Sequence, residues 1–193
     1  MKKILVLILI FPVISSYSQK WLKNYESVDE FSCGISKVKK DGKIGYVNKD
    51  GVEIIKLQYD DGLTFAEGYT AVKSGTKWMY LDSTGKAITG QIFDDAINFS
   101  HGLAPAEKNN RYGYINTAGE VVIPFEFTNA RSFSEDLGPV SNGKGFWGYI
   151  DKKANWVINP VYDFTDSFEN GEARVMKGQK VFYIDRQNKV LHE

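Results

Sequence analysis

The sequence predicts an all-β fold of five tandem, three-stranded antiparallel units of about 34 residues, stacked face to face. Tyrosines recur every 34 or 35 residues, phenylalanines recur at a similar interval ahead of them, and another aromatic residue lies six positions before each phenylalanine. The units are expected over residues 25–58, 59–92, 93–126, 127–161 and 162–193. The recurring tyrosines are Tyr46, Tyr80, Tyr114, Tyr149 and Tyr183, and the phenylalanines are Phe31, Phe65, Phe99, Phe133 and Phe168.

The first residues have the pattern of a secretory signal peptide. Lys2 and Lys3 precede an apolar run, and small residues follow it. The run, from Ile4 to Ile14, is too short for a transmembrane helix, which needs about 20 residues. We expect a signal peptide at 1–18 cleaved near Ser18/Gln19, a linker at 19–24 and a repeat domain at 25–193. The protein would then be exported, periplasmic or extracellular, without membrane insertion after cleavage.

Each unit is expected to contain a loop with one buried phenylalanine and then three short strands, called A, B and C. Strand A is, for example, YTAV, strand B is WGYID and strand C is EVVI. Proline occurs in strand A and in strand C but never in strand B. Since proline cannot donate to a β-ladder, strand B is expected to be central, with A and C outside it. Short connections indicate an antiparallel meander. The prolines concerned are Pro105, Pro139, Pro124 and Pro160.

Both faces of strand B are apolar, so neighbouring units should cover both. The tyrosines lie on one face and glycines on the other in the units that have them. We expect the glycine face of each unit to meet the aromatic face of the next, with Trp78 over Gly45 and Trp147 over Gly113. Phe182 would then lie exposed on the last unit. Open stacking into a β-solenoid-like repeat is expected, and a closed, five-bladed propeller-like ring is the alternative.

The spacing and the recurrent W-G-Y-[IV]-[DN] segment resemble the tryptophan-glycine (WG) repeat family of bacterial proteins. The resemblance covers essentially all of residues 25–193, although Met79 and Phe182 occupy the glycine position in two units. It implies a β-rich repeat and often an exported or envelope location, and it implies no shared enzymatic activity.

Composition and side-chain chemistry exclude several classes of function. The chain has 24 basic and 24 acidic residues, and loss of Lys2 and Lys3 leaves a charge of −2, so no nucleic-acid partner is expected. Cys33 is alone and forms no internal disulfide. His101, His192 and Cys33 lie in different units without metal-ligand or catalytic spacing. We therefore expect no cofactor, no metal and no enzymatic activity. A hydrolase with dispersed carboxylates is the third possibility, because such acids need no local motif.

Positions that are not repeated are better candidates for recognition. Trp156 is the second residue of strand C, where other units have Glu53, Ala87, Val121 and Val190. A tryptophan at an outward position is a candidate anchor for a partner. Tyr69 and Arg111 are weaker candidates. The sequence favours a non-enzymatic binding or scaffold protein with a protein partner in the bacterial envelope. Carbohydrate or cell-wall ligand binding through exposed aromatics is the alternative.

Overall fold

The computed structural model describes residues 20–193, so the expected signal peptide lies outside the described residues. A single 3-10 turn, η1 (Lys20–Asn24), precedes five antiparallel sheets in chain order. The first sheet contains β1 (Ser27–Val28), β2 (Ile35–Lys40), β3 (Lys43–Asn48) and β4 (Glu53–Tyr59). The second contains β5 (Asp61–Gly62), β6 (Tyr69–Ser74) and β7 (Lys77–Asp82).

The remaining three sheets repeat the pattern of the first. The third sheet contains β8 (Asp95–Ala96), β9 (Leu103–Lys108), β10 (Arg111–Asn116) and β11 (Val121–Phe127). The fourth contains β12 (Asn129–Ala130), β13 (Gly138–Ser141), β14 (Trp147–Ile150) and β15 (Trp156–Tyr162). The fifth contains β16 (Phe164–Thr165), β17 (Glu172–Lys177), β18 (Lys180–Asp185) and β19 (Val190–His192).

Strand order confirms that strand B is central in each four-stranded sheet, as in the order β1-β2-β3-β4. The prediction that strand A is an outer strand is wrong. A two-residue strand from the preceding loop pairs with its far edge, as Asp95 and Ala96 pair with Glu107 and Ala106. Two residues are too few to give a periodic signal in the sequence. In the second unit strand C is reduced to isolated bridges, such as Leu81 with Ala87.

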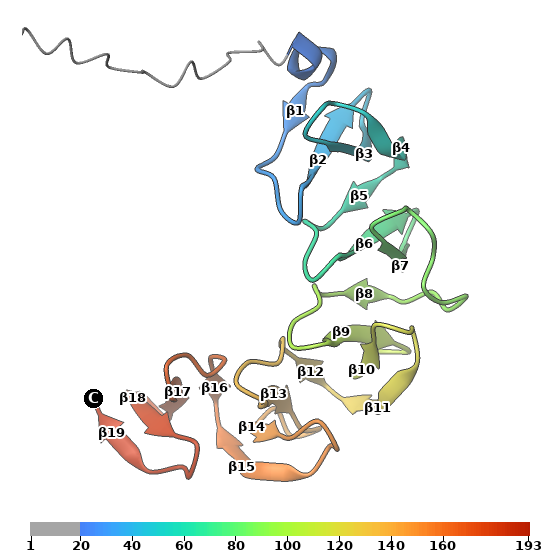
Figure 1. The fold of residues 1–193 in the computed structure, drawn as a ribbon. Helices are drawn as coiled ribbons and strands as arrows, with labels where there is room; N and C mark the ends of the chain where they lie inside the picture. The colour runs from blue at the N-terminus through green and yellow to red at the C-terminus, as the bar shows by residue number, and fades with distance from the viewer. Residues whose placement is uncertain (1–19) are drawn as a thin grey trace, which may run out of the picture.

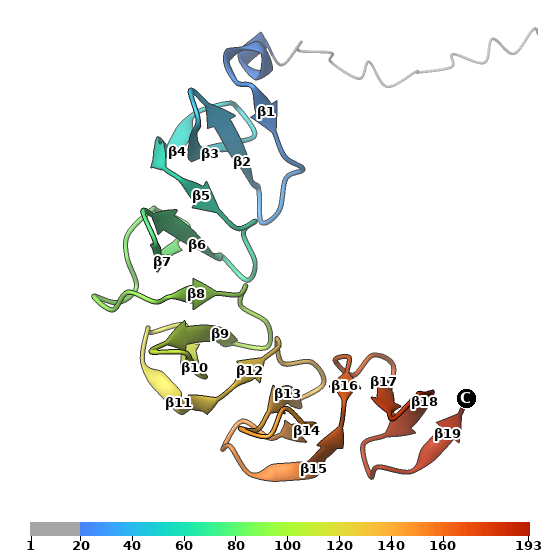
Figure 2. The ribbon, with the colours of Figure 1, turned by 180° about the vertical axis from the view of Figure 1, so that it is seen from behind.

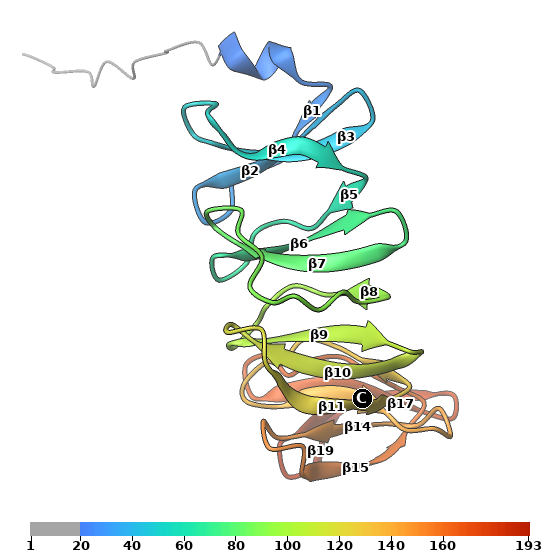
Figure 3. The same cartoon turned by 90° about the vertical axis from the view of Figure 1, so that its right-hand side faces the viewer.

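The five sheets are stacked side by side into an open arc, and none of them is closed (Figures 1 and 2). A view from the side shows the first three sheets one below another, while the fourth and fifth sheets overlap in this projection (Figure 3). The C strands β4, β11, β15 and β19 lie along the convex edge of the arc, and both views agree on this placement. The four units that have a C strand therefore each present it to solvent at the same edge.

A buried tyrosine from strand B joins each unit to the next. At each junction the tyrosine hydroxyl donates to a backbone carbonyl of the next unit. The pairs are Tyr46 with Leu63 (2.7 Å), Tyr80 with Ile97 (2.9 Å), Tyr114 with Arg131 (2.9 Å) and Tyr149 with Asp166 (2.7 Å). The loop phenylalanine of the following unit packs against the same ring, with centroids 4.8 to 5.4 Å apart in the four pairs. All four tyrosines are fully buried. The tyrosine face of one unit therefore meets the loop and glycine face of the next.

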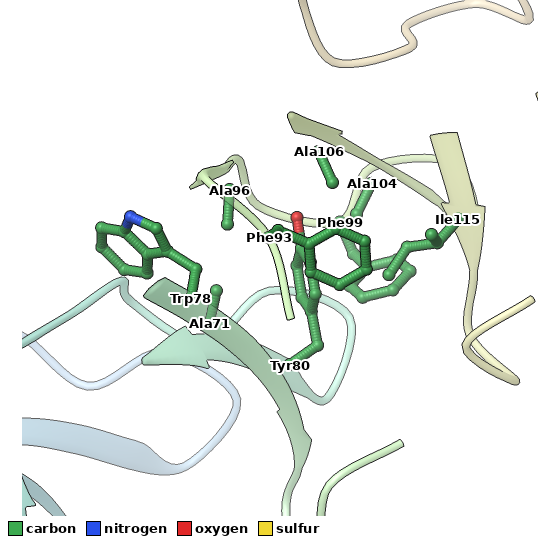
Figure 4. Packing of buried hydrophobic residues seen from close by; sticks show 9 residues of the cluster. All are labelled: Ala71, Trp78, Tyr80, Phe93, Ala96, Phe99, Ala104, Ala106 and Ile115. Atoms are coloured by element: carbon green, nitrogen blue, oxygen red, sulfur yellow. The ribbon is translucent and has the colours of Figure 1, made fainter. Parts of the chain in front are cut away.

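This arrangement is the reverse of the predicted stacking. Trp78 clusters with Tyr80 and with residues of the third unit, and Figure 4 shows its indole beside Ala71 and Ala96. A Cβ at Gly45 would instead meet the backbone of its own β4, 2.8 Å from the Ile55 oxygen and 2.9 Å from the Leu57 nitrogen. Register shifts between β3 and β4 bring that backbone close. The glycine is needed within its own sheet, and not to accommodate a neighbouring tryptophan.

Phe182 is also placed differently from the prediction. It is half-buried in a cluster with Trp147 and lies 6.0 Å from the Tyr162 ring, so it faces the fourth unit. On the Trp147 side of this cluster, the Arg131 guanidinium lies over the indole, 5.1 Å from its centroid. The free face of the fifth unit carries Tyr183, whose ring stacks on His192 at 4.4 Å.

Both ends of the repeat are capped by side chains. At the N-terminal end Trp21 packs edge-on against Tyr25 and Phe31, with centroids 6.2 and 6.3 Å apart. Its ring lies against Gly51 of the first unit. The equivalent glycine of the second unit, Gly85, lies instead against strand C of the first unit. Trp21 therefore docks on the first unit. At the other end, Glu172 and Arg174 occupy positions that are Leu137 and Pro139 in the fourth unit. Charged side chains suit this face, which no unit covers within residues 20–193.

Candidate interaction surface

Many of the exposed apolar side chains of the C-terminal half lie at the start of the outer strands. We call six of them, in three successive units, the apolar rim. Their exposed fractions run from 39% to 53%. In the first unit the same positions hold Glu53 and Ile54, and in the second they hold Ala87 and Ile88. The apolar rim is Val121 and Val122 of β11, Trp156 and Val157 of β15, and Val190 and Leu191 of β19.

A tight turn before each outer strand fixes where the rim begins. In the fourth unit, Oδ1 of Asp151 accepts the backbone N–H groups of Lys153 and Asn155 at 2.8 and 2.9 Å. The Asn155 side-chain amide donates to the same carboxylate and lowers the pKa of Asp151. Asn48, Asp82, Asn116 and Asp185 accept the matching amides in the other units. These residues act as turn formers, as their recurrence predicts.

Trp156 is the one aromatic residue of the rim. Its side chain is 39% exposed, and its ring meets Phe127 of the preceding outer strand edge-on, with centroids 6.0 Å apart. One side of the indole is therefore held by the protein while the other faces solvent. Regular alternation would point Val157 inward beside an outward Trp156, yet Val157 is 47% exposed. Tyr149 of β14 pairs with Ile158 of β15, and the next residue, Ile150, pairs with Trp156. Val157 is therefore left without a partner strand residue, and the inward–outward alternation of side chains is broken there.

Tyr69 and Arg111 are placed apart from the rim. Tyr69 begins β6 and is half-buried, 5.0 Å from the Phe99 ring in the junction between the second and third units. Arg111 is exposed at the start of β10, opposite Lys108. Tyr69 thus contributes to packing. The structure does not gather Trp156, Tyr69 and Arg111 into one sheet.

Two of the three outer strands that carry the rim are guarded against pairing with another strand. Pro124 lies in β11 and Pro160 in β15, and in β4, which is not part of the rim, Lys56 holds the position that matches Pro124. Proline provides no N–H group for a ladder, and lysine on an edge strand discourages pairing. Recognition along this edge is therefore favoured through side chains, and strand addition is disfavoured.

The recurring acids are used inside the fold. Glu26, Asp60, Asp94 and Asp163 each accept a backbone N–H group from the A–B turn of their own unit. The Lys43 and Lys77 side chains donate to Asp60 and Asp94 and lower the pKa of these carboxyls. Across residues 20–193, no three His, Cys, Asp or Glu side chains are grouped so that they could hold a metal ion.

Some acids do face each other across two strands. Asp95 of β8 lies opposite Glu107 of β9, and burial, with the nearby Asp95 and Asp94 charges, raises the pKa of Glu107. The Tyr112 hydroxyl donates to Asp95 at 2.7 Å. Three surface hollows lie in the fourth and fifth units, and this pair lines none of them.

His101, His192 and Cys33 have separate surroundings. His101 and Cys33 occupy the same exposed turn position, with positive φ angles of 54° and 52°. The His101 backbone N–H donates to Glu67 at 2.7 Å. His192 lies 3.1 Å from a Glu172 oxygen at the end of the chain. The structure brings no two of these three side chains into contact.

The spacing, the aromatic junctions and the strand order recur together in a known family. The pattern of the family described as "WG containing repeat" matches residues 23–43, 44–78, 78–112, 112–145 and 147–180. The chain belongs to the WG-repeat family. No curated protein matches this WG-repeat chain in sequence.

Solved structures similar to the WG-repeat chain are β-propellers, which agrees with the propeller-like alternative for its architecture. Kluyveromyces lactis Hsv2 matches with a TM-score of 0.52 and 11% identity, over 82% of this chain and 59% of that one. Hsv2 of Kluyveromyces marxianus gives a TM-score of 0.52 and 11% identity, over 84% and 63%. The chain thus spans about three fifths of the length of these structures. The likeness shows the fold alone.

Within residues 20–193, no helix has the length and hydropathy of a membrane-spanning segment.

Proposed function

We propose that this WG-repeat protein is an exported, non-enzymatic binding or scaffold protein whose partner in the bacterial envelope is another protein. The observation that carries the proposal is the apolar rim. It extends over three successive outer strands and has a partly held tryptophan near its middle. Aromatic anchors surrounded by aliphatic side chains are common at the centres of protein interfaces. The leader-like first residues support export.

The composition of the rim favours a protein partner over a carbohydrate. Trp156 is its one aromatic residue, and the other five members are valines and a leucine. Sugar faces are recognised by stacking on flat aromatic rings, and one ring gives little area for a chain of sugars. Phe146 is also exposed, but it lies in the turn at the opposite end of the central strand. A mixed aliphatic and aromatic row suits a protein surface.

Site-specific photocrosslinking tests this proposal. A photoreactive amino acid placed at Trp156 in the full chain should trap a discrete protein in an extract of the source envelope. The matched control carries the same amino acid at Glu53, which holds the equivalent position in the first unit. Equal products from both positions, or no protein product from Trp156, would show that the rim is not the binding surface.

A second variant measures how much the anchor contributes. With the photoreactive group moved to Val190, Trp156→Ala should reduce the trapped product several-fold, because interface tryptophans commonly contribute about 2 kcal/mol or more. Glu53→Ala is the control and should leave the yield unchanged. If Trp156→Ala retains the full yield, the indole is not the anchor.

A further inference from the structure

Basic side chains lie beside the apolar rim in the two C-terminal units. The turn of the fourth unit carries Lys152 and Lys153, and the turn of the fifth carries Arg186 and Lys189. Lys152 is 3.0 Å from Asp136. In the described chain, Lys153, Arg186 and Lys189 form no ion pair, and all three residues are exposed. They are free to meet charges on a partner.

The acids of the same turns are held by the backbone. Asp151 accepts two turn amides, and Asp185 accepts those of Gln187 and Lys189 at 2.9 and 2.8 Å. Their carboxylates face the turn interior, while the basic side chains project from it. In the first unit, the basic Lys49 of this turn is followed by the acidic Asp50. In the third unit, Glu120 is the one charged residue of the turn. The turn of the second unit has one basic residue, Lys86. Turns with two basic side chains are therefore found only in the units where the rim holds Trp156, Val157, Val190 and Leu191.

We propose that the partner presents an acidic segment with interspersed apolar side chains, which pack on the rim while its carboxylates face Lys153, Arg186 and Lys189. This inference rests on the proposed function and names the chemistry of the partner. Like charges would repel a basic segment, so the basic turns select against it. Pro124 and Pro160 disfavour strand pairing, so the segment binds through its side chains.

The curvature of the arc favours a segment over a membrane surface. An anionic bilayer would also attract basic and apolar side chains. However, β11, β15 and β19 lie along the convex edge and face successively different directions (Figure 1). A flat bilayer cannot contact all three strands at once. An extended chain can follow the curve from one unit to the next.

Peptide probes test the charge preference directly. The intact protein is titrated with a labelled peptide of alternating Glu and Leu, and with peptides that carry Gln or Lys in place of Glu. The Glu peptide should bind most tightly, and its affinity should fall as salt is raised. Absence of binding, equal binding of the Glu and Lys peptides, or affinity that ignores salt would overturn the proposal.

Charge reversal locates the preference on the two turns. The triple variant Lys153→Glu, Arg186→Glu and Lys189→Glu should bind the Glu peptide about tenfold less tightly, because three exposed charge contacts become repulsive. The control Lys86→Glu changes the matching turn position of the second unit, where the Lys86 N–H donates to Asp82. It should leave affinity unchanged. Circular dichroism verifies that both variants fold.

The outcomes separate this inference from the proposed function. If Trp156 still traps a partner protein and the triple variant traps it equally well, the acidic partner is wrong and the protein-binding function remains. If vesicles of phosphatidylcholine with phosphatidylglycerol bind the protein and the Glu peptide does not, the rim recognises lipid and the inference is wrong. If photocrosslinking also fails to trap a protein, the proposed function is wrong as well.

Discussion

Replacing Gly113 with alanine tests the reason for the glycine in the central strand. The added Cβ would lie 2.5 Å from the Ile123 oxygen and 2.9 Å from the Phe125 nitrogen, both in the backbone of the adjacent outer strand. Backbone atoms cannot rotate away, so β10 and β11 must separate. Overpacking of this kind costs about 1–3 kcal/mol. For a domain of this size, that lowers the melting temperature by roughly 2–12 °C.

The assay is thermal and urea unfolding of the purified chain, followed by circular dichroism. The matched control is Gly90→Ala, because no atom lies within 4 Å of a Cβ there and its φ angle is not positive. Its melting temperature should stay the same or rise slightly, since alanine restricts the unfolded chain. A Gly113→Ala variant as stable as the parent would refute the backbone argument.

A double-mutant cycle with Trp147→Ala distinguishes this explanation from contact with a neighbouring tryptophan. Trp147 packs toward the fifth unit, whereas Gly113 meets its own outer strand. The two losses of stability should therefore add to within about 0.5 kcal/mol. If Trp147→Ala rescues Gly113→Ala, the glycine accommodates the tryptophan and the reasoning is refuted.

Three further predictions concern the junctions and the cap. Tyr114→Phe should cost about 1 kcal/mol by leaving the Arg131 carbonyl without its donor. Tyr183→Phe should be nearly neutral in urea unfolding, because the Tyr183 hydroxyl makes no such bond within residues 20–193. Burial raises the pKa of Tyr46, Tyr80, Tyr114 and Tyr149. Stability should therefore be full below about pH 10 and fall as the pH rises beyond it, and tyrosinate absorbance should appear together with unfolding. Trp21→Ala should speed amide exchange in the first sheet and leave the fifth unchanged, because the cap contacts the first unit alone.

Local rules visible in the sequence account for the architecture within a unit. The 34-residue interval between Tyr46 and Tyr80 predicts the repeat length. The absence of proline from strand B predicts that this strand is central in the sheet. The acids and amides that end strand B form turns in each unit because a short side chain reaches amides two and four residues ahead. These features depend on neighbours close in sequence, so pattern alone could predict them.

The direction of stacking could not be predicted in the same way. Both faces of strand B are apolar, so hydrophobicity fits either order. The predicted stacking direction rests on fitting a large residue, Trp78, over a small one, Gly45. In the structure, the atoms close to Gly45 belong to β4, which register shifts bring near it. A bulge depends on hydrogen bonding between strands and leaves little trace in residue types. The same effect exposes Val157, which alternation placed inside.

The candidate site was visible only in part. Trp156 stood out because no other unit has a tryptophan at that position. Val122 and Leu191 resemble ordinary core residues in sequence, and their exposure follows from the outer strand having one neighbour instead of two. Arg186 and Lys189 read as common turn residues. Their position beside the rim becomes evident only when the two turns are placed at the same edge of the arc.

The tyrosine junctions have a consequence for how such a chain can change in length. Each hydroxyl donates to a carbonyl 17 residues further along, at all four junctions. Deleting or duplicating one whole internal unit would leave every remaining tyrosine with a carbonyl at the same offset. Gene duplication could therefore lengthen or shorten the arc without a new core. The fifth unit is the exception, since Glu172 and Arg174 would be buried if another unit followed, so growth must occur ahead of it.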